Sequence, residues 1–177
     1  GVFTDIFTGM TAGAIPAYAT IDDYLILMST ADVPRYWDQT TAKVLGTNTP
    51  NGSFGITHAN RFWLAGEPSE PSRLFYSQAL PAGADGDWNG IGAGLIDVDP
   101  GDGDKITGLA SYKGELWVFK GPNKGSIHRI TGRSPASFDR IVFVRGLGAV
   151  CHNAIFEYTD DLGFLWADGS IHSLKAT

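Results

Sequence analysis

Four aspartates within eight residues form the strongest candidate for a chemical site. They alternate with glycine and proline in the stretch 97–104, and they are Asp97, Asp99, Asp102 and Asp104. Calcium takes six to eight oxygen ligands, and carboxylates on a glycine-rich loop can wrap around such an ion. The spacing differs from that of an EF-hand. Two interpretations stay open, a calcium site and a turn that uses Asp and Gly for their backbone geometry, and the turn is preferred. No other cofactor is indicated.

The remaining candidate nucleophiles and bases do not match a catalytic pattern. Gly-Ser-Ile-His occurs twice, so His128 and His172 take equivalent places in two repeats, which favours a packing role over a shared metal site. Cys151 and His152 are adjacent, and adjacent side chains on a strand point to opposite faces. Ser53 lies in Asn-Gly-Ser-Phe-Gly, which lacks the spacing of a nucleophile elbow. We therefore expect a protein that is not an enzyme.

The five tryptophans could stack on a sugar if they were exposed. Three of them fall within repeated apolar runs, where packing between sheets is the expected role. These three are Trp63, Trp117 and Trp166. Trp37 and Trp88 lie nearer to loops, so they are the candidates for contacts at the surface.

The chain that positions these residues is predicted to be all-β. Glycine and proline contribute 23 and 9 of the 177 residues, and aromatic residues make up 12%. Apolar residues cluster in short runs bounded by turn residues, and no long stretch shows helical spacing. The clearest runs span residues 24–28, 61–65, 115–120 and 162–167.

Each of these runs lies in the middle of a repeated unit of strand, tight turn, strand, polar loop and strand. Tyr24, Phe62, Leu116 and Gly163 as equivalent positions give spacings of 38, 54 and 47 residues. Because propeller blades repeat at about 40 to 50 residues, the sequence predicts a β-propeller-like fold with about four degenerate blades of three to four antiparallel strands. An ordinary β-sandwich is the alternative.

The domain organisation follows from this repeat. Residues 1–177 form a single propeller-like domain or a fragment of a larger propeller. The stretch 78–104 is predicted to be a long loop or an inserted hairpin, and loops of this kind on a rigid scaffold often contact partners.

Charge and hydropathy exclude two classes of partner. The 13 basic and 19 acidic residues give a net charge of −6, whereas proteins that bind DNA through bulk charge carry a basic excess. No apolar run approaches the roughly 20 residues that span a bilayer. We therefore expect no membrane-spanning segment and no stable binding of nucleic acid.

Five segments carry a resemblance to a known family, and they are residues 24–38, 61–77, 85–89, 97–109 and 116–120. They include a Pro-x-Tyr-Trp-Asp turn and a Gly-Asp-Gly-Asp loop. These segments resemble tailed-bacteriophage structural proteins with β-propeller domains, above all the tail nozzle of the tail tubular protein B type. The resemblance implies a virion component in a ring around the genome exit channel. Its implied partners are copies of itself, other tail proteins and, transiently, passing DNA.

Two further hypotheses come from other classes. A carbohydrate- or receptor-binding propeller would use Trp37 or Trp88 as a stacking platform, with calcium in the acidic loop. A propeller hydrolase would need carboxylates that converge from several blades, and no sequence feature indicates such convergence.

Overall fold

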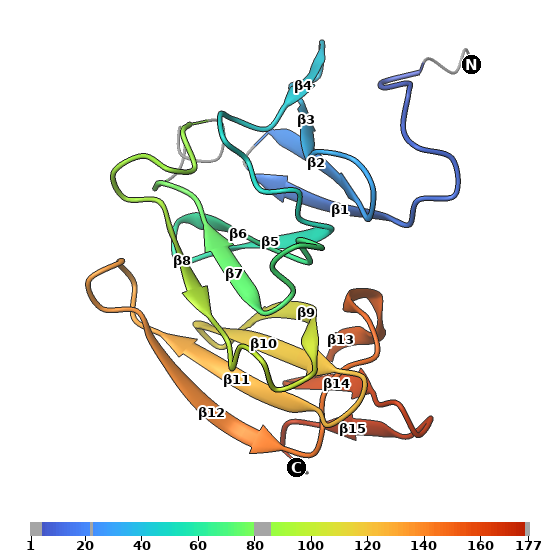
Figure 1. Cartoon of the computed structure of the whole chain (residues 1–177), viewed down its shortest axis with the longest axis vertical. Helices are drawn as coiled ribbons and strands as arrows, with labels where there is room; N and C mark the ends of the chain where they lie inside the picture. The colour runs from blue at the N-terminus through green and yellow to red at the C-terminus, as the bar shows by residue number, and fades with distance from the viewer. Residues whose placement is uncertain (1–4, 22, 80–85, 176–177) are drawn as a thin grey trace.

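The computed structural model describes residues 5–21, 23–79 and 86–175, and this part of the chain folds into four small antiparallel sheets (Figure 1). We call these sheets blades 1 to 4. Blade 1 contains β1 (Pro16–Ile21), β2 (Tyr24–Ser29), β3 (Arg35–Trp37) and β4 (Ala42–Val44). Blade 2 contains β5 (Phe54–His58), β6 (Arg61–Ala65), β7 (Arg73–Tyr76) and β8 (Gly94–Asp97). Blade 3 contains β9 (Lys105–Tyr112), β10 (Glu115–Gly121), β11 (Ser126–Thr131) and β12 (Asp139–Arg145). Blade 4 contains β13 (Ile155–Tyr158), β14 (Asp161–Leu165) and β15 (Ile171–Ser173), preceded by the short 3-10 helix η1 (His152–Ala154).

The strands of each blade follow one another in the sheet in the order of the sequence. The first strands lie innermost, since β1 contacts β5, β5 contacts β9 and β9 contacts β13. This arrangement is that of a β-propeller with four blades, three of four strands and one of three. The predicted fold class is therefore confirmed. The four apolar runs of the sequence correspond to β2, β6, β10 and β14, the second strand of each blade.

Tight turns join the first two strands of the blades. In blade 2 the turn residues Ala59 and Asn60 both have positive φ, at 47° and 57°. In blade 3 Lys113 and Gly114 do the same, at 51° and 78°. Two consecutive residues with positive φ give the type I′ turn, whose twist matches that of the flanking strands, and Asn and Gly tolerate this conformation best. The turn-like pairs in the sequence thus place the hairpins correctly.

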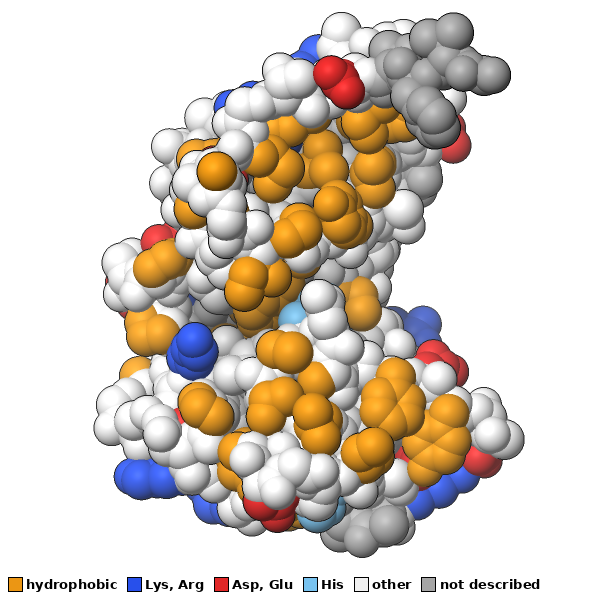
Figure 2. All heavy atoms as spheres, turned by 90° about the vertical axis from the view of Figure 1, so that its right-hand side faces the viewer, with side chains coloured by type: hydrophobic (Ala, Val, Ile, Leu, Met, Phe, Trp, Pro, Cys, Tyr) orange, Lys and Arg blue, Asp and Glu red, His pale blue; other side chains and the backbone are white. Residues whose placement is uncertain are grey.

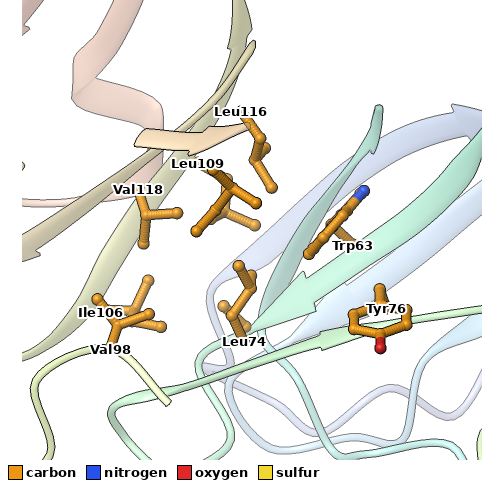
Figure 3. Packing of buried hydrophobic residues seen from close by; sticks show 10 residues of the cluster. Trp63, Leu74, Tyr76, Val98, Ile106, Leu109, Leu116 and Val118 are labelled. Atoms are coloured by element: carbon orange, nitrogen blue, oxygen red, sulfur yellow. The ribbon is translucent and has the colours of Figure 1, made fainter. Parts of the chain in front are cut away.

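Three hydrophobic clusters hold consecutive blades together. The first joins blades 1 and 2 around Ile26 and Phe62, and the second joins blades 2 and 3 around Trp63 and Val118 (Figure 3). The third joins blades 3 and 4, where the rings of Phe119 and Phe164 lie 5.2 Å apart. Among residues 5–21, 23–79 and 86–175, no such cluster joins blade 4 back to blade 1. The ring of blades is therefore open on one side.

The predicted loop 78–104 is in part a regular element. Its residues 80–85 lie outside the described part of the chain. Residues 94–97 form β8, the outer strand of blade 2, which pairs with β7 along its whole length. The prediction of a long loop or inserted hairpin was wrong for this end of the stretch, which is the edge strand of blade 2. The glycines before and at position 94 favour a loop by local pattern, and the strand forms through its pairing with β7.

Candidate functional site

The acidic loop 97–104 surrounds a cation, and that cation is a lysine side chain. Lys120 on β10 is 0% exposed. Its Nζ donates hydrogen bonds to the carbonyl oxygens of Val98 (2.6 Å) and Asp99 (2.8 Å). It also lies 3.2 Å from Oγ of Ser72 and 2.8 Å from a carboxylate oxygen of Asp102. A buried ammonium is stable only when its donors and its charge are matched in this way.

Asp99 binds two further basic side chains. Its two carboxylate oxygens lie 2.6 Å from the Arg140 guanidinium and 3.0 Å from that of Arg145, both on β12. Partial burial alone would raise the pKa of Asp99, but the hydrogen bonds and charges of these arginines outweigh it and hold the pKa below its usual value. Asp99 is therefore a structural ion-pair partner that fixes β12 to the loop.

Asp104 and Asp97 have separate partners. The Asp104 carboxylate accepts the backbone N–H groups of Asn123, Lys124 and Gly125, each at 2.8 Å. These bonds lower the pKa of Asp104 although burial acts in the opposite direction. Asp97 pairs with Arg73 across the strands β7 and β8 at 2.8 Å.

The hypothesis that the four aspartates bind calcium is not supported by this geometry. Each carboxylate faces a different partner, and three of the four are neutralised by lysine or arginine. Within the described part of the chain no three His, Cys, Asp or Glu side chains come together in a way that could hold a metal. The preferred interpretation, a turn built on Asp and Gly, agrees better with the loop, where Asp99 and Gly101 have positive φ.

The two equivalent histidines serve the packing of their blades. His128 is 0% exposed, and its Nε2 lies 2.8 Å from Oγ of Ser126. Burial lowers the pKa of His128 to about 4, so its ring is neutral near pH 7. His172 repeats the contact, with Nε2 2.6 Å from Oγ of Ser170. The repeated Ser-x-His pattern is thus a local side-chain pair, within β11 for Ser126 and His128 and at the start of β15 for Ser170 and His172.

The structure agrees with the sequence prediction for three tryptophans and contradicts it for Trp88. Trp63, Trp117 and Trp166 are buried, which confirms their packing role. Trp88 is only 4% exposed and belongs to the cluster between blades 1 and 2, so its assignment as a surface contact was wrong. The loop that carries Trp88 folds back toward residue 47, and the backbone N–H of Trp88 donates a hydrogen bond to the carbonyl oxygen of Thr47 at 2.9 Å. Trp37 on β3 is half-buried.

A cleft of about 500 Å³ lies where the innermost strands begin. Its wall is largely apolar, with Phe54 from blade 2 and Ile106 from blade 3, and Pro16 of blade 1 also borders it. Sites for small molecules typically occupy 300 to 1,000 Å³ and have apolar walls with a few polar groups. The cleft is therefore of suitable size for a ligand.

Cys151 and His152 both line this cleft. They do not lie on a strand, as the sequence suggested, because Cys151 precedes the helix η1 and His152 begins it. The His152 ring stacks on Phe54, with ring centres 5.0 Å apart, and its Nδ1 accepts the backbone N–H of Leu109 at 3.3 Å. Burial lowers the pKa of His152. The ring is thus fixed by contacts within the fold.

The two ends of the open ring expose apolar sheet faces. On β1, Ala17 packs into the cluster with blade 2, so Tyr18 must point to the opposite face of the sheet, where it is 60% exposed. On β13, Ile155 packs toward blade 3, and Phe156 and Tyr158 point away, 42% and 45% exposed. Figure 2 views the molecule from the right-hand side of Figure 1. It shows apolar side chains in the upper and in the lower part of this side, with a hollow between the two parts.

No family model and no curated protein matches this chain. The functional assignment therefore depends on the geometry described above and on the resemblance of the five sequence segments. Among the described residues, no helix has the length and apolar character needed to cross a membrane.

Sequence reasoning missed the two most informative features, Lys120 and the free faces. Lys120 ends a strongly apolar run, and such a position could have indicated a buried charge that needs acceptors. We call the sheet faces with Tyr18 on blade 1 and with Phe156 and Tyr158 on blade 4 the free faces. Their signal in the sequence is weaker: Phe156 and Tyr158 point to one face and Ile155 to the other, so both faces of this strand carry apolar residues. Which of these faces stays uncovered depends on the order of the blades.

Proposed function

We propose that this chain is a structural component of a bacteriophage tail, part of the nozzle or tube wall around the genome exit channel. It acts by assembly with copies of itself and with neighbouring tail proteins, and the proposal assigns it no active site. Contact with passing DNA is transient in this proposal, because a net charge of −6 disfavours stable binding.

The observation that carries the proposal is the pair of apolar sheet faces, on blades 1 and 4, that no other blade covers; on blade 1 the ring of Phe7 lies over Arg35 and covers part of the face. The free face of blade 4 presents Phe156, Tyr158 and Ile171, and Ile171 is 69% exposed. Contiguous apolar patches of this kind mark sites where proteins associate. A component that works by assembly needs such faces, and the sequence resemblance to tail proteins supplies the type of assembly.

The state of the polar groups also supports a structural role. The acidic loop is occupied by Lys120, Arg140 and Arg145, and these interactions stabilise the junction of blades 2 and 3. The buried His128 is bonded to Ser126. These groups have the environment of stabilising contacts, whereas general acids and bases are directed toward a substrate position.

Mass spectrometry of tailed phage particles from the source of the chain tests this function. Peptides of the chain should occur in the purified tail fraction, at a copy number that matches a ring and in fixed ratio to other tail proteins. If the peptides are present in the lysate and missing from the particles, the proposal is wrong.

A binding module is the second candidate, and the central cleft is the observation that favours it. The cleft offers about 500 Å³ beside Phe54 and His152, and an aromatic wall suits a sugar or another flat ligand. A glycan array probed with the labelled chain tests this. Binding that is lost in Phe54→Ala and kept in Trp37→Ala would support the cleft, and the reverse result would support the platform on Trp37.

A further inference from the structure

We propose that blade 4 binds an extended segment of a neighbouring protein as its fourth strand. The segment carries consecutive branched or aromatic residues flanked by Lys or Arg. Blades 1 to 3 each contain four strands, whereas the described residues of blade 4 form three. This inference rests on the proposed function in one respect, since it names a surface and a partner for assembly with a neighbouring protein.

The outer edge of β15 has no partner strand within the described part of the chain, and Figure 1 shows β15 at the rim of the molecule. Leu174 donates its backbone N–H to the carbonyl oxygen of Leu162 on β14 at 3.0 Å. Because bonded and non-bonded pairs alternate along antiparallel strands, His172 also faces β14, and the backbone groups of Ile171 and Ser173 point outward. Free donors and acceptors of this kind are a template for a further strand.

Two exposed apolar side chains of blade 3 lie on the side of the sheet that faces blade 4. Ile141 of β12 pairs with Arg129, and Arg129 pairs with Trp117, so their side chains share one face. Trp117 belongs to the cluster that joins blades 3 and 4, and the Phe143 ring contacts it edge-on at 5.0 Å. Ile141 and Phe143 are nevertheless 37% and 41% exposed. We call them the outer apolar pair.

The stacking of the blades explains why the outer apolar pair is uncovered. Blade 4 lies on blade 3 with matching strands together, since Phe164 of β14 meets Phe119 of β10. Their first hairpins also meet, where Lys113 donates a hydrogen bond to the carbonyl oxygen of Asp160 at 2.9 Å. Between blades 2 and 3 the fourth strand is present, and Asp99 directly after β8 binds β12. A fourth strand on blade 4 would therefore lie over the outer apolar pair.

These surroundings define the chemistry of the bound segment. One side of the added strand covers the outer apolar pair, and the other side lies beside Ile171, which is 69% exposed on the free face. Since successive side chains of a strand point to opposite faces, apolar residues are needed at consecutive positions. The exposed Asp139 begins β12, and the exposed Asp168 precedes β15. An added strand antiparallel to β15 would have one of these carboxylates near each end, where they attract Lys or Arg.

The sequence of this chain favours another protein over a second copy as the source of the segment. Runs of three or more Val, Ile, Leu, Met, Phe, Tyr or Trp residues occur at 24–28, 62–64, 74–76, 116–119, 141–144 and 164–166. Five of these runs lie in or overlap strands that have a neighbour on both sides. The remaining run is in β12, and its flanking Arg140 and Arg145 are already bound to Asp99.

The test measures the binding of a free peptide to the folded chain. The probe is Arg-Ile-Val-Phe-Val-Arg, the sequence of residues 140–145, because this strand fills the fourth position in blade 3. A peptide with proline in place of the first valine is its control, since proline cannot donate to a strand.

Two pairs of variants locate the bound peptide. Ile141→Asn removes part of the outer apolar pair, and Val142→Asn is its control, because Val142 is also 37% exposed and points to the opposite face of β12. Ile171→Pro removes an outward N–H, which an edge strand tolerates, and Ile171→Val keeps it. Circular dichroism with thermal melting checks that each variant is folded. If Ile171→Pro is unfolded, the first pair and hydrogen exchange decide.

We expect calorimetric titration to show equal binding of the probe by the wild type, Val142→Asn and Ile171→Val. Ile141→Asn should bind about tenfold more weakly, because the added strand would bury an amide without a partner. Ile171→Pro should also bind more weakly, and the proline peptide should not bind. Amide hydrogen exchange should slow at Ile171 and Ser173 when the probe binds, and stay unchanged at His172, which already faces β14.

Other results overturn the inference. Equal losses in Ile141→Asn and Val142→Asn, with none in Ile171→Pro, would place the probe on the free edge of β12 and favour a second copy as the partner. A wild type that binds no probe up to about 1 mM contradicts the strand site and leaves the proposed function to the mass spectrometry of particles. A chain that binds the probe as expected but is missing from the particles keeps the strand site and contradicts the proposed function.

Discussion

The junction between blades 2 and 3 and the gap between blades 4 and 1 are built from similar strands and have opposite properties. At the junction, the cluster around Trp63 and Val118 is closed, and the loop 97–104 holds the Lys120 ammonium beside it. At the gap, Tyr18 and Ile171 stay 60% and 69% exposed. Apolar alternation is present on both sides of the blades. The difference shows that a blade face is buried where the next blade covers it and stays in part exposed where none does; in the proposed function, the exposed faces are the ones used for assembly.

The sharpest contrast is within blade 4, between Phe164 and Phe156. Phe164 is 0% exposed and faces blade 3, while Phe156 is 42% exposed and faces the gap. We expect Phe164→Ala to lower the free energy of unfolding by about 4 kcal/mol, the cost of a cavity in a packed core. Phe156→Ala should cost less than about 1 kcal/mol in the single copy. Urea denaturation at a concentration below assembly measures both, and equal losses would break the comparison.

Removal of the lysine charge should have the next largest effect. Lys120→Met keeps the apolar stem and leaves Asp102 and two carbonyls without their cation. Since the loss of one partner of a buried ion pair costs about 3 kcal/mol or more, we expect a loss near this value in urea denaturation. Lys124→Met, at an exposed side chain four residues on, is the control and should change stability by less than about 0.5 kcal/mol. A gain of stability in Lys120→Met would contradict the role of this charge.

The buried His128 makes the junction sensitive to acid. Burial holds its pKa at about 4 in the folded chain, below the 6.5 that is usual for a histidine, so between these values the unfolded chain binds a proton that the folded chain does not. Stability is therefore full above pH 6.5 and falls as the pH drops toward 4, by about 2 kcal/mol between pH 7 and pH 5.

His128→Gln should lose this part of the pH dependence. The charged groups that face the ring are Asp99, Arg140, Lys120 and Arg145. The slope of unfolding free energy against pH is the measurement. The pKa values of His152 and His58 are also lowered by burial, so these two histidines keep a smaller dependence of the unfolding free energy on pH in the His128→Gln variant. An unchanged slope would mean that His128 does not titrate on unfolding.

The smallest expected effect is that of calcium. Calcium at about 5 mM exceeds the dissociation constants of even weak extracellular calcium sites, which are on the order of 1 mM. Because Lys120 occupies the acidic loop, this concentration should shift the melting temperature no more than the same concentration of magnesium does. Differential scanning fluorimetry with EDTA as reference measures this. A rise of several degrees that EDTA reverses would restore the calcium hypothesis for Asp97, Asp99, Asp102 and Asp104.

The repeated strands were predictable because each one is specified locally. The run 61–65, for example, is bounded by Asn60 and Gly66, and its apolar residues need no distant contact to favour a strand. The same holds for the Ser-x-His pairs around His128 and His172, whose partner lies two residues away.

The remaining features depend on contacts between distant parts of the chain. Trp88 looked exposed among glycines, yet the return of its loop toward Thr47 places it in the first cluster. The acidic loop was a candidate calcium site with a turn as the preferred interpretation, and neither indicated that the cation beside it comes from Lys120, on a strand that follows it in the sequence. No local pattern encodes which apolar faces stay uncovered, since this depends on how many blades close the ring.

A cryo-electron microscopy image of the purified wild-type chain is the most direct test of the account. We predict class averages in which two or more copies associate, with the exposed faces around Tyr18 of blade 1 and Ile171 of blade 4 at the contacts. Single open rings of four blades at every concentration, with Tyr18 and Ile171 still exposed, would contradict it.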